Sequence, residues 1–167
     1  MSNKKTFAVI NVSEPKSLFL AKQIAKANPV LLFDQNPTTL LEVHTQILIE
    51  NPEAKVEMMI CPTNASWEAD IIILSNYAAT DIILAEKIRK VATGKIVLIL
   101  ENEKNPMHFE NPVDKLQQLF PFSKVIQSIE IPEDLTSSLF LKGKDADALK
   151  TILTLYTNIG FKTNILI

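Results

Sequence analysis

The sequence predicts an α/β protein, built on a mostly parallel β-sheet of about seven or eight strands with helices packed on both faces. Two observations lead to this prediction. Short apolar runs rich in β-branched residues recur along the chain, and they do not alternate with polar residues. Between them lie stretches in which apolar residues recur at helical spacing. Strands without alternation are buried on both faces, so helices must cover both sides of the sheet.

The first half of the chain alternates strands and helices. The apolar runs predict strands at Thr6–Val12, Val30–Phe33, Val56–Ile60 and Asp70–Leu74. Helical spacing predicts helices at Lys16–Asn28 and Pro37–Glu50. Ser13 is expected to cap the first helix, with Pro15 in its first turn, where a missing N–H costs nothing. The stretch Asn64–Glu68 is expected to form a turn.

The second half continues the same pattern. Strands are predicted at Lys95–Leu100, Lys124–Ile129, Ser137–Leu141 and Lys162–Ile167. Helices are predicted from a Thr80 cap to Gly94, over Val113–Phe120, and from an Asp145 cap to Gly160, with Phe161 packing on the last one. A polar loop fills Glu101–Pro112. No repeat or linker interrupts the chain, so residues 1–167 are expected to form one domain.

Composition excludes several classes of function. The chain carries 17 Lys and Arg against 19 Asp and Glu, a net charge of −2, which is too little positive charge for a nucleic-acid-binding surface. No apolar run reaches the length of a membrane span, and the polar N-terminus lacks the apolar core of a signal peptide. We therefore expect a cytoplasmic protein. Cys61 is the single cysteine, and no Cys or His pair has metal-ligand spacing.

The loop after the first strand is where a parallel sheet of this kind, the Rossmann fold, binds the diphosphate of a dinucleotide. Its usual G-x-G-x-x-G glycines are replaced by Asn11, Ser13 and Lys16. Glu14 adds a negative charge that would repel a diphosphate. Two hypotheses stay open: a self-capped helix start that binds nothing, which we favour, or a rebuilt anion site formed by Ser13, Ser17 and Lys16.

Two further loops are candidates for binding a nucleotide. Asp34 ends the second strand, where an acidic residue usually binds the ribose hydroxyls of NAD, and Gln35 follows it. The alternative for Asp34 is an Asx-type turn, and the two interpretations carry equal weight. Ser75, Asn76 and Tyr77 follow the fourth strand; Asn76 and Tyr77 could contact a ligand or simply form a turn before the next helix.

The chain resembles the NADP oxidoreductase family typified by the deazaflavin-dependent NADP reductases. The likeness lies in four stretches: Phe7–Ile10, Glu68–Ser75, Ala92–Val97 with Asn105-Pro106, and Asn158–Phe161. The resemblance implies an NAD(P)-binding Rossmann fold and hydride transfer. The chain departs from the family in its glycine loop. It also has Asp34-Gln35 where NADP-preferring members often carry a Ser/Thr-Arg pair. The resemblance therefore leaves open whether the cofactor is NAD or NADP.

Other single residues give weaker indications. His44 is expected at the surface, Cys61 as a small buried residue, Trp67 packed on the turn Asn64–Glu68, and His108 in the polar loop. No catalytic constellation can be assembled from local spacing. The leading hypothesis is therefore an NADP-oxidoreductase-like protein that binds a dinucleotide or a related nucleotide at the positions named above. Its rival is a non-enzymatic Rossmann scaffold that acts through protein contacts, for example as a homodimer.

Overall fold

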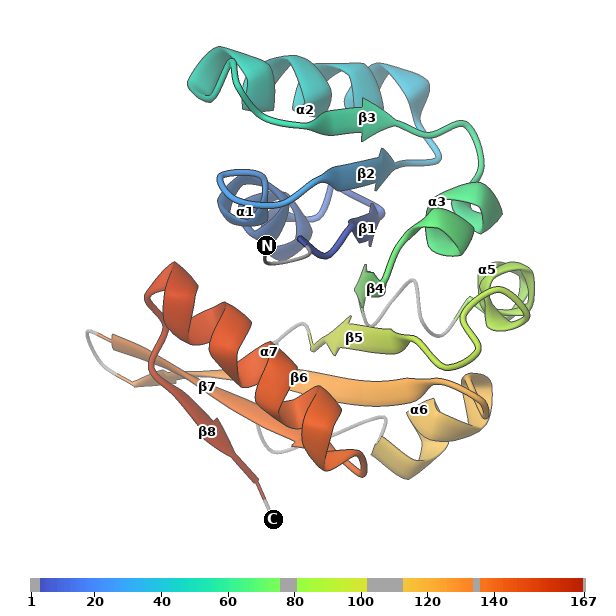
Figure 1. Ribbon diagram of the computed structural model, residues 1–167, viewed down its shortest axis with the longest axis vertical. Helices are drawn as coiled ribbons and strands as arrows, with labels where there is room; N and C mark the ends of the chain where they lie inside the picture. The colour runs from blue at the N-terminus through green and yellow to red at the C-terminus, as the bar shows by residue number, and fades with distance from the viewer. Residues whose placement is uncertain (1–3, 76–80, 102–112, 134–135, 167) are drawn as a thin grey trace.

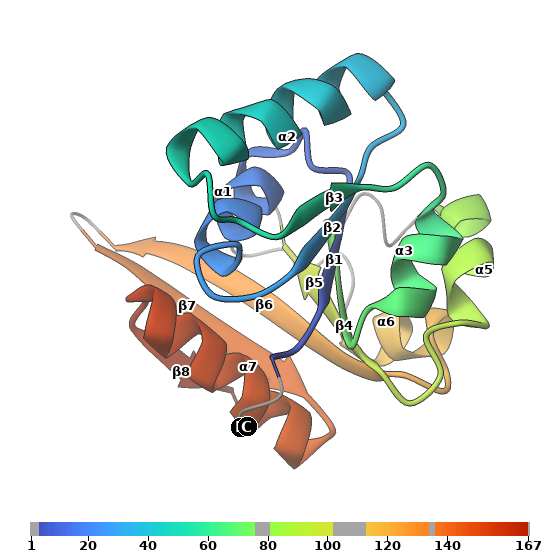
Figure 2. The same ribbon diagram turned by 45° about the horizontal axis from the view of Figure 1, so that its top comes forward.

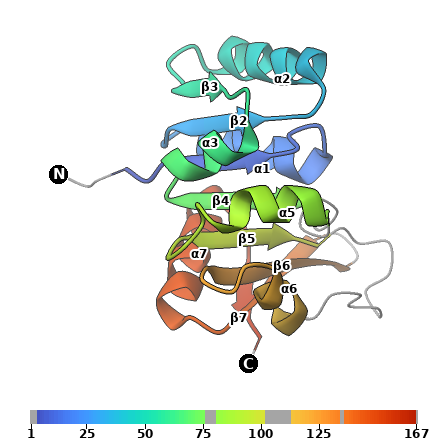
Figure 3. The same cartoon turned by 90° about the vertical axis from the view of Figure 1, so that its right-hand side faces the viewer.

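The computed structural model describes residues 4–75, 81–101, 113–133 and 136–166, and it contains an 8-stranded sheet. The strand order is β3-β2-β1-β4-β5-β6-β7-β8 (Figures 1 and 3). The strands are β1 Phe7–Ile10, β2 Val30–Phe33, β3 Val56–Met58, β4 Ile71–Ser75, β5 Ile96–Leu100, β6 Lys124–Glu133, β7 Thr136–Gly143 and β8 Thr163–Ile165. Strands β1 to β6 are parallel, β7 runs antiparallel to β6, and β8 is parallel to β7. The mostly parallel sheet is thus confirmed.

Helices cover both faces of this sheet, as the unalternating strands predicted. They are α1 Pro15–Ile24, α2 Pro37–Glu50, α3 Pro62–Glu68, α5 Ile82–Arg89, α6 Val113–Leu119 and α7 Ala146–Ile159. Helices α1, α2 and α7 lie on one face and α3, α5 and α6 on the other (Figure 2). Successive strand residues point to opposite faces, so Val9 belongs to the first core and Ala8 and Ile10 to the second. The result is a three-layer Rossmann-like fold.

The last helix follows the prediction at both ends. The Asp145 side chain accepts a hydrogen bond from the Ala148 amide at 2.8 Å, which makes it the N-cap. Gly160 ends the helix with φ 105°, a left-handed conformation that favours glycine. Phe161 then packs edge-on against Tyr156, with ring centroids 5.6 Å apart.

Several local predictions were wrong. Residues 62–68 form a helix, α3, where we expected a turn; Pro62 occupies its first turn, and the buried Ala65 and Ser66 pack it onto the sheet. Helix α5 is capped by Asp81, whose carboxylate accepts from two amides of the first turn. Thr80, the expected cap, lies outside the described residues. Helix α1 ends at Ile24, before the predicted Asn28.

The two edges of the sheet are formed by short strands. Edge strands β3 and β8 each contain 3 residues, and β3 is shorter than the predicted Val56–Ile60. Within the described residues, no helix has both the length and the apolar character needed to cross a bilayer.

Candidate functional site

The structure brings three predicted residues together at one edge of the sheet. Ile10 lies in register with Phe33 of β2 and with Leu74 of β4. Asn11, Asp34 and Ser75 follow these residues directly, so they lie side by side beyond the carboxyl ends of three adjacent strands. Strand β1 lies between β2 and β4, where the strand order reverses direction. This is the topological switch point at which parallel α/β sheets bind their ligands.

Asn11 adopts a backbone conformation that usually favours glycine. Its φ is +60°, the left-handed region that Asn tolerates better than most residues. Its N–H donates to the Phe33 carbonyl at 2.9 Å, and its own carbonyl accepts from the Glu14 N–H at 3.3 Å. The tight turn after β1 is therefore preserved without glycine.

Ser13 does not cap helix α1, and this prediction was wrong. The N-cap is Glu14, which makes no side-chain cap hydrogen bond, and Pro15 occupies the first helical position. Ser13 thus lies outside the cap position and is exposed to solvent. Its backbone N–H instead donates to the Asp34 carboxylate at 3.0 Å. The loop amides of residues 11–14 are all hydrogen-bonded within the protein.

Asp34 connects this loop to the end of β2. Its Oδ2 accepts from the Ser13 N–H, and its Oδ1 accepts from the Asn36 N–H at 2.9 Å, which closes the predicted Asx turn. The residue is only 8% exposed. Asn36 then caps α2 by accepting from the amides of Thr38 and Thr39. Each carboxylate oxygen keeps a second lone pair, so the Asx turn does not exhaust the capacity of Asp34.

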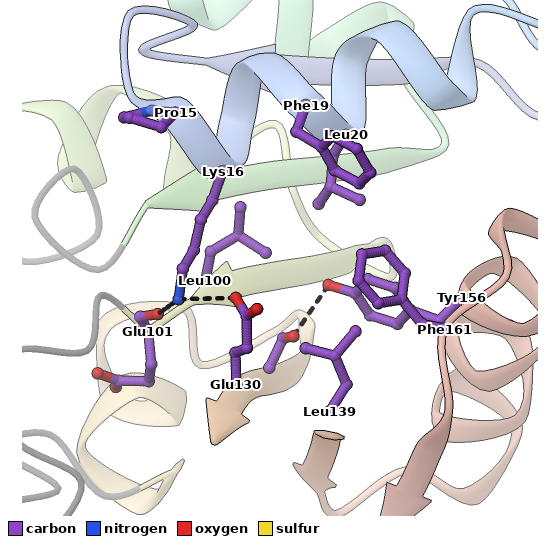
Figure 4. Close-up of a pocket in the computed structure, with 11 residues that line it drawn as sticks. Pro15, Lys16, Phe19, Leu20, Leu100, Glu101, Glu130, Leu139, Tyr156 and Phe161 are labelled. Carbon is purple, nitrogen blue, oxygen red and sulfur yellow. Dashed lines mark hydrogen bonds and ion pairs between the residues drawn. The ribbon is translucent and has the colours of Figure 1, made fainter. Parts of the chain in front are cut away.

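Lys16 occupies the position of the third motif glycine, and its side chain crosses to strands β5 and β6 (Figure 4). Its ammonium donates to the Glu101 carbonyl at 2.9 Å and pairs with Glu130 Oε2 at 3.2 Å. The positive charge is therefore balanced by Glu130. The neighbouring Ser17 is fully buried, and its hydroxyl has no hydrogen-bond partner among the described residues.

The loop after β4 is described only in part. Ser75 is 2% exposed and lies at the end of the strand. Asn76 and Tyr77, the other candidates of this loop, lie outside the described residues, as do His108 and the Asn105-Pro106 pair.

A cavity of about 640 Å³ opens beside Asp34. Apolar side chains from β2, α2, the end of β3 and α5 form most of its walls, and polar groups come from Asp34, Gln35, Asp81 and Lys87. Sequence reasoning missed the contribution of α3 and α5 to this wall. Proline after Cys61 was the available signal for α3, because proline favours the first turn of a helix.

The remaining single residues take ordinary places. His44 is half-buried, with Nε2 3.3 Å from the Val56 carbonyl. Cys61 is partly exposed, not buried as expected, and a hydrogen bond from the Asn64 backbone lowers the pKa of its thiol. Trp67 is 67% exposed, and the Lys95 ammonium lies 5.9 Å from its ring centroid. The described residues contain no cluster of three or more potential metal ligands.

Comparison with solved structures places the fold among reductases. A putative F420-dependent NADP-reductase from Arthrobacter sp. FB24 superposes with a TM-score of 0.73 at 19% identity, covering 98% of this chain and 84% of that one. A pyrroline-5-carboxylate reductase from Coxiella burnetii superposes with a TM-score of 0.74 at 10% identity, covering 99% of this chain and 60% of that one. Pyrroline carboxylate reductase from Plasmodium falciparum, solved with NADP bound, superposes with a TM-score of 0.67 at 15% identity. The match covers 100% of this chain and 59% of that one.

No protein-family model and no curated protein sequence matches the chain. The structural likeness nevertheless shows the fold: the chain has a Rossmann-like fold that is also found in these reductases and in a UDP-glucose dehydrogenase. The resemblance that the sequence suggested is confirmed at the level of the fold.

Proposed function

We propose that the protein binds an adenine nucleotide at the switch point, with the adenosine portion in the cavity beside Asp34. Among dinucleotides it prefers NAD to NADP. The observation that carries the proposal is the Asp34 carboxylate, which ends β2 on the wall of a large, mostly apolar cavity. Its volume of about 640 Å³ lies within the range of about 300–1,000 Å³ usual for ligand sites.

The walls of this cavity suit a flat base. Leu40, Met58 and Ile83 offer apolar surface, and Ile83 is 68% exposed beside the cavity. The remaining lone pairs of Asp34 can accept from the ribose hydroxyls. A 2′-phosphate would instead meet this negative charge, which is why NADP is disfavoured.

The diphosphate contributes little in this proposal. The amides of residues 11–14 already donate within the protein, and Pro15 has no N–H to offer. The negative charge of Glu14 would also repel a diphosphate at this loop. Adenosine and AMP should therefore bind almost as well as NAD, whereas a glycine-loop protein depends on its diphosphate contacts.

The proposal is tested by calorimetry and thermal unfolding with adenosine, AMP, NAD and NADP. A ligand at a hundredfold excess over its Kd adds about 2.7 kcal/mol to stability. We expect adenosine, AMP and NAD to raise the midpoint and NADP to have a much smaller effect. Ile83→Glu should abolish the effect. Ile49→Glu, at a 75% exposed position on α2 outside the cavity, is the matched control and should leave it intact.

Tighter binding of NADP than of NAD would contradict the role given to Asp34. No midpoint rise with any of the four compounds at millimolar concentration would contradict the nucleotide site itself. That result would favour the rival hypothesis, a scaffold acting through protein contacts. The observation behind this rival is the apolar rim of the same cavity, where Leu41 is 53% and Ile60 98% exposed. Sedimentation analysis of the same samples would then detect a homodimer.

A further inference from the structure

A second cavity, of about 310 Å³, lies between α1, the sheet and α7 (Figure 4). It is lined by helix α1, by the carboxyl end of β5, by β6 and β7, and by helix α7 with Phe161, the second residue after that helix. It shares no lining residue with the cavity beside Asp34. Its volume is at the low end of the range of about 300–1,000 Å³ typical of ligand sites, so its occupant must be small.

Three aromatic rings form one wall of this cavity. Phe161 meets Phe19 edge-on at 5.7 Å and Tyr156 edge-on at 5.6 Å between ring centroids. Leu20, Leu100 and Leu139 add further apolar surface to the lining. Aromatic faces carry negative partial charge, so this wall attracts an apolar body and also a cation.

The opposite wall carries the Lys16–Glu130 ion pair (Figure 4). Lys16 uses its ammonium twice, on Glu130 and on the Glu101 carbonyl. Glu130 accepts through Oε2 alone; its Oε1 accepts no hydrogen bond from the described residues, and its side chain is 29% exposed. The Lys16 ammonium keeps one N–H, whereas Glu130 Oε1 keeps both of its lone pairs, so the larger spare capacity at this wall belongs to a carboxylate oxygen.

The negative charge of Glu130 also acts on Tyr156 in the aromatic wall. Burial raises the pKa of Tyr156, and the nearby Glu130 charge raises that pKa further. The Tyr156 hydroxyl donates to Ser128 Oγ at 2.9 Å. Carboxylate and ring faces thus favour the same kind of charge in the space between them.

We propose that this cavity binds a small primary amine with an aromatic body. The ammonium group donates to Glu130, and the ring packs against Phe19, Tyr156 and Phe161. A carboxylate ligand is disfavoured because the charge of Glu130 and the negative faces of the aromatic rings both repel it. A neutral alcohol of the same shape gains the apolar contacts but not the attraction to Glu130.

Three probes of one skeleton test the charge requirement: 2-phenylethylamine, 2-phenylethanol and phenylacetate. Binding to the full chain is followed by calorimetry and by NMR shift perturbation. We expect the amine to bind about tenfold more tightly than either of the others. Glu130→Gln should weaken the amine about tenfold and leave the alcohol unchanged. Glu50→Gln is the matched control, because Glu50 pairs with Lys22 at 3.0 Å elsewhere on the surface.

Phe19→Ala tests the aromatic wall at a position that is 44% exposed, so the fold should tolerate the change. We expect it to weaken the amine about threefold. No binding of the amine at millimolar concentration would overturn the proposal. So would equal binding of phenylacetate and the amine, or a Glu130→Gln variant that binds the amine as the unaltered protein does.

Discussion

Removing the Asp34 carboxylate should loosen the switch-point loop and destabilise the whole protein. Asp34→Ala deletes two hydrogen bonds from backbone amides, those of Ser13 and Asn36. Hydrogen bonds to a charged group are worth about 1.5–3 kcal/mol each. Because Ser13 is exposed, its amide can donate to water instead, which offsets part of the loss. We therefore expect a loss of about 2–4 kcal/mol, a large share of a typical stability of about 5–15 kcal/mol.

The assay is urea unfolding followed by circular dichroism, with two comparison variants. Asp34→Asn keeps one acceptor oxygen and should lose about half as much as Asp34→Ala. Asp70→Ala is the control: Asp70 is exposed and accepts a single bond, from the Thr6 N–H at 2.8 Å. Because water can replace this exposed bond, its loss should cost only about 1 kcal/mol, less than a buried bond to a charged group. Equal stabilities for Asp34→Ala and Asp70→Ala would refute the connecting role of Asp34.

Three further predictions concern single positions. Asn11→Ala forces a φ of +60° on a residue that resists it and should cost about 1 kcal/mol, whereas Asn11→Gly should not. Gly143→Ala would place its Cβ 2.5 Å from Ile126 Cδ1 and should cost about 1–3 kcal/mol in thermal unfolding. Tyr156 keeps its proton in the folded state above the unfolded pKa of about 10, so stability should fall as the pH rises beyond that value. Tyr156→Phe should remove this slope and cost about 1 kcal/mol at neutral pH, through the lost bond to Ser128.

The sequence predicted the layers of the fold because burial on both faces leaves a direct mark on composition. A strand such as Ile71–Ser75 is buried at every residue, and its apolar run records this. Helix α3 left no such mark. It has 7 residues, fewer than the window over which apolar residues at helical spacing can be recognised.

The position of the candidate site could be predicted from the sequence, but the contacts between its residues could not. Asn11 and Asp34 could be placed because each follows a strand, and parallel strands end at one edge. The partners of Lys16 could not, since Glu101 lies 85 residues away and local spacing carries no information about that contact. The Ser13 error is different, because a signal was available: proline favours the first helical position, which places Pro15 at the start of α1 and Glu14 at its N-cap.

The short strands at the two ends of the sheet have a consequence for behaviour in concentrated solution. A neighbouring molecule that added a strand to β3 or β8 would find 3 residues to pair with, and Glu57 places a charge in the middle of β3. Adding a strand from another molecule at either edge would form few hydrogen bonds. The short edge strands therefore disfavour fibril formation through the sheet.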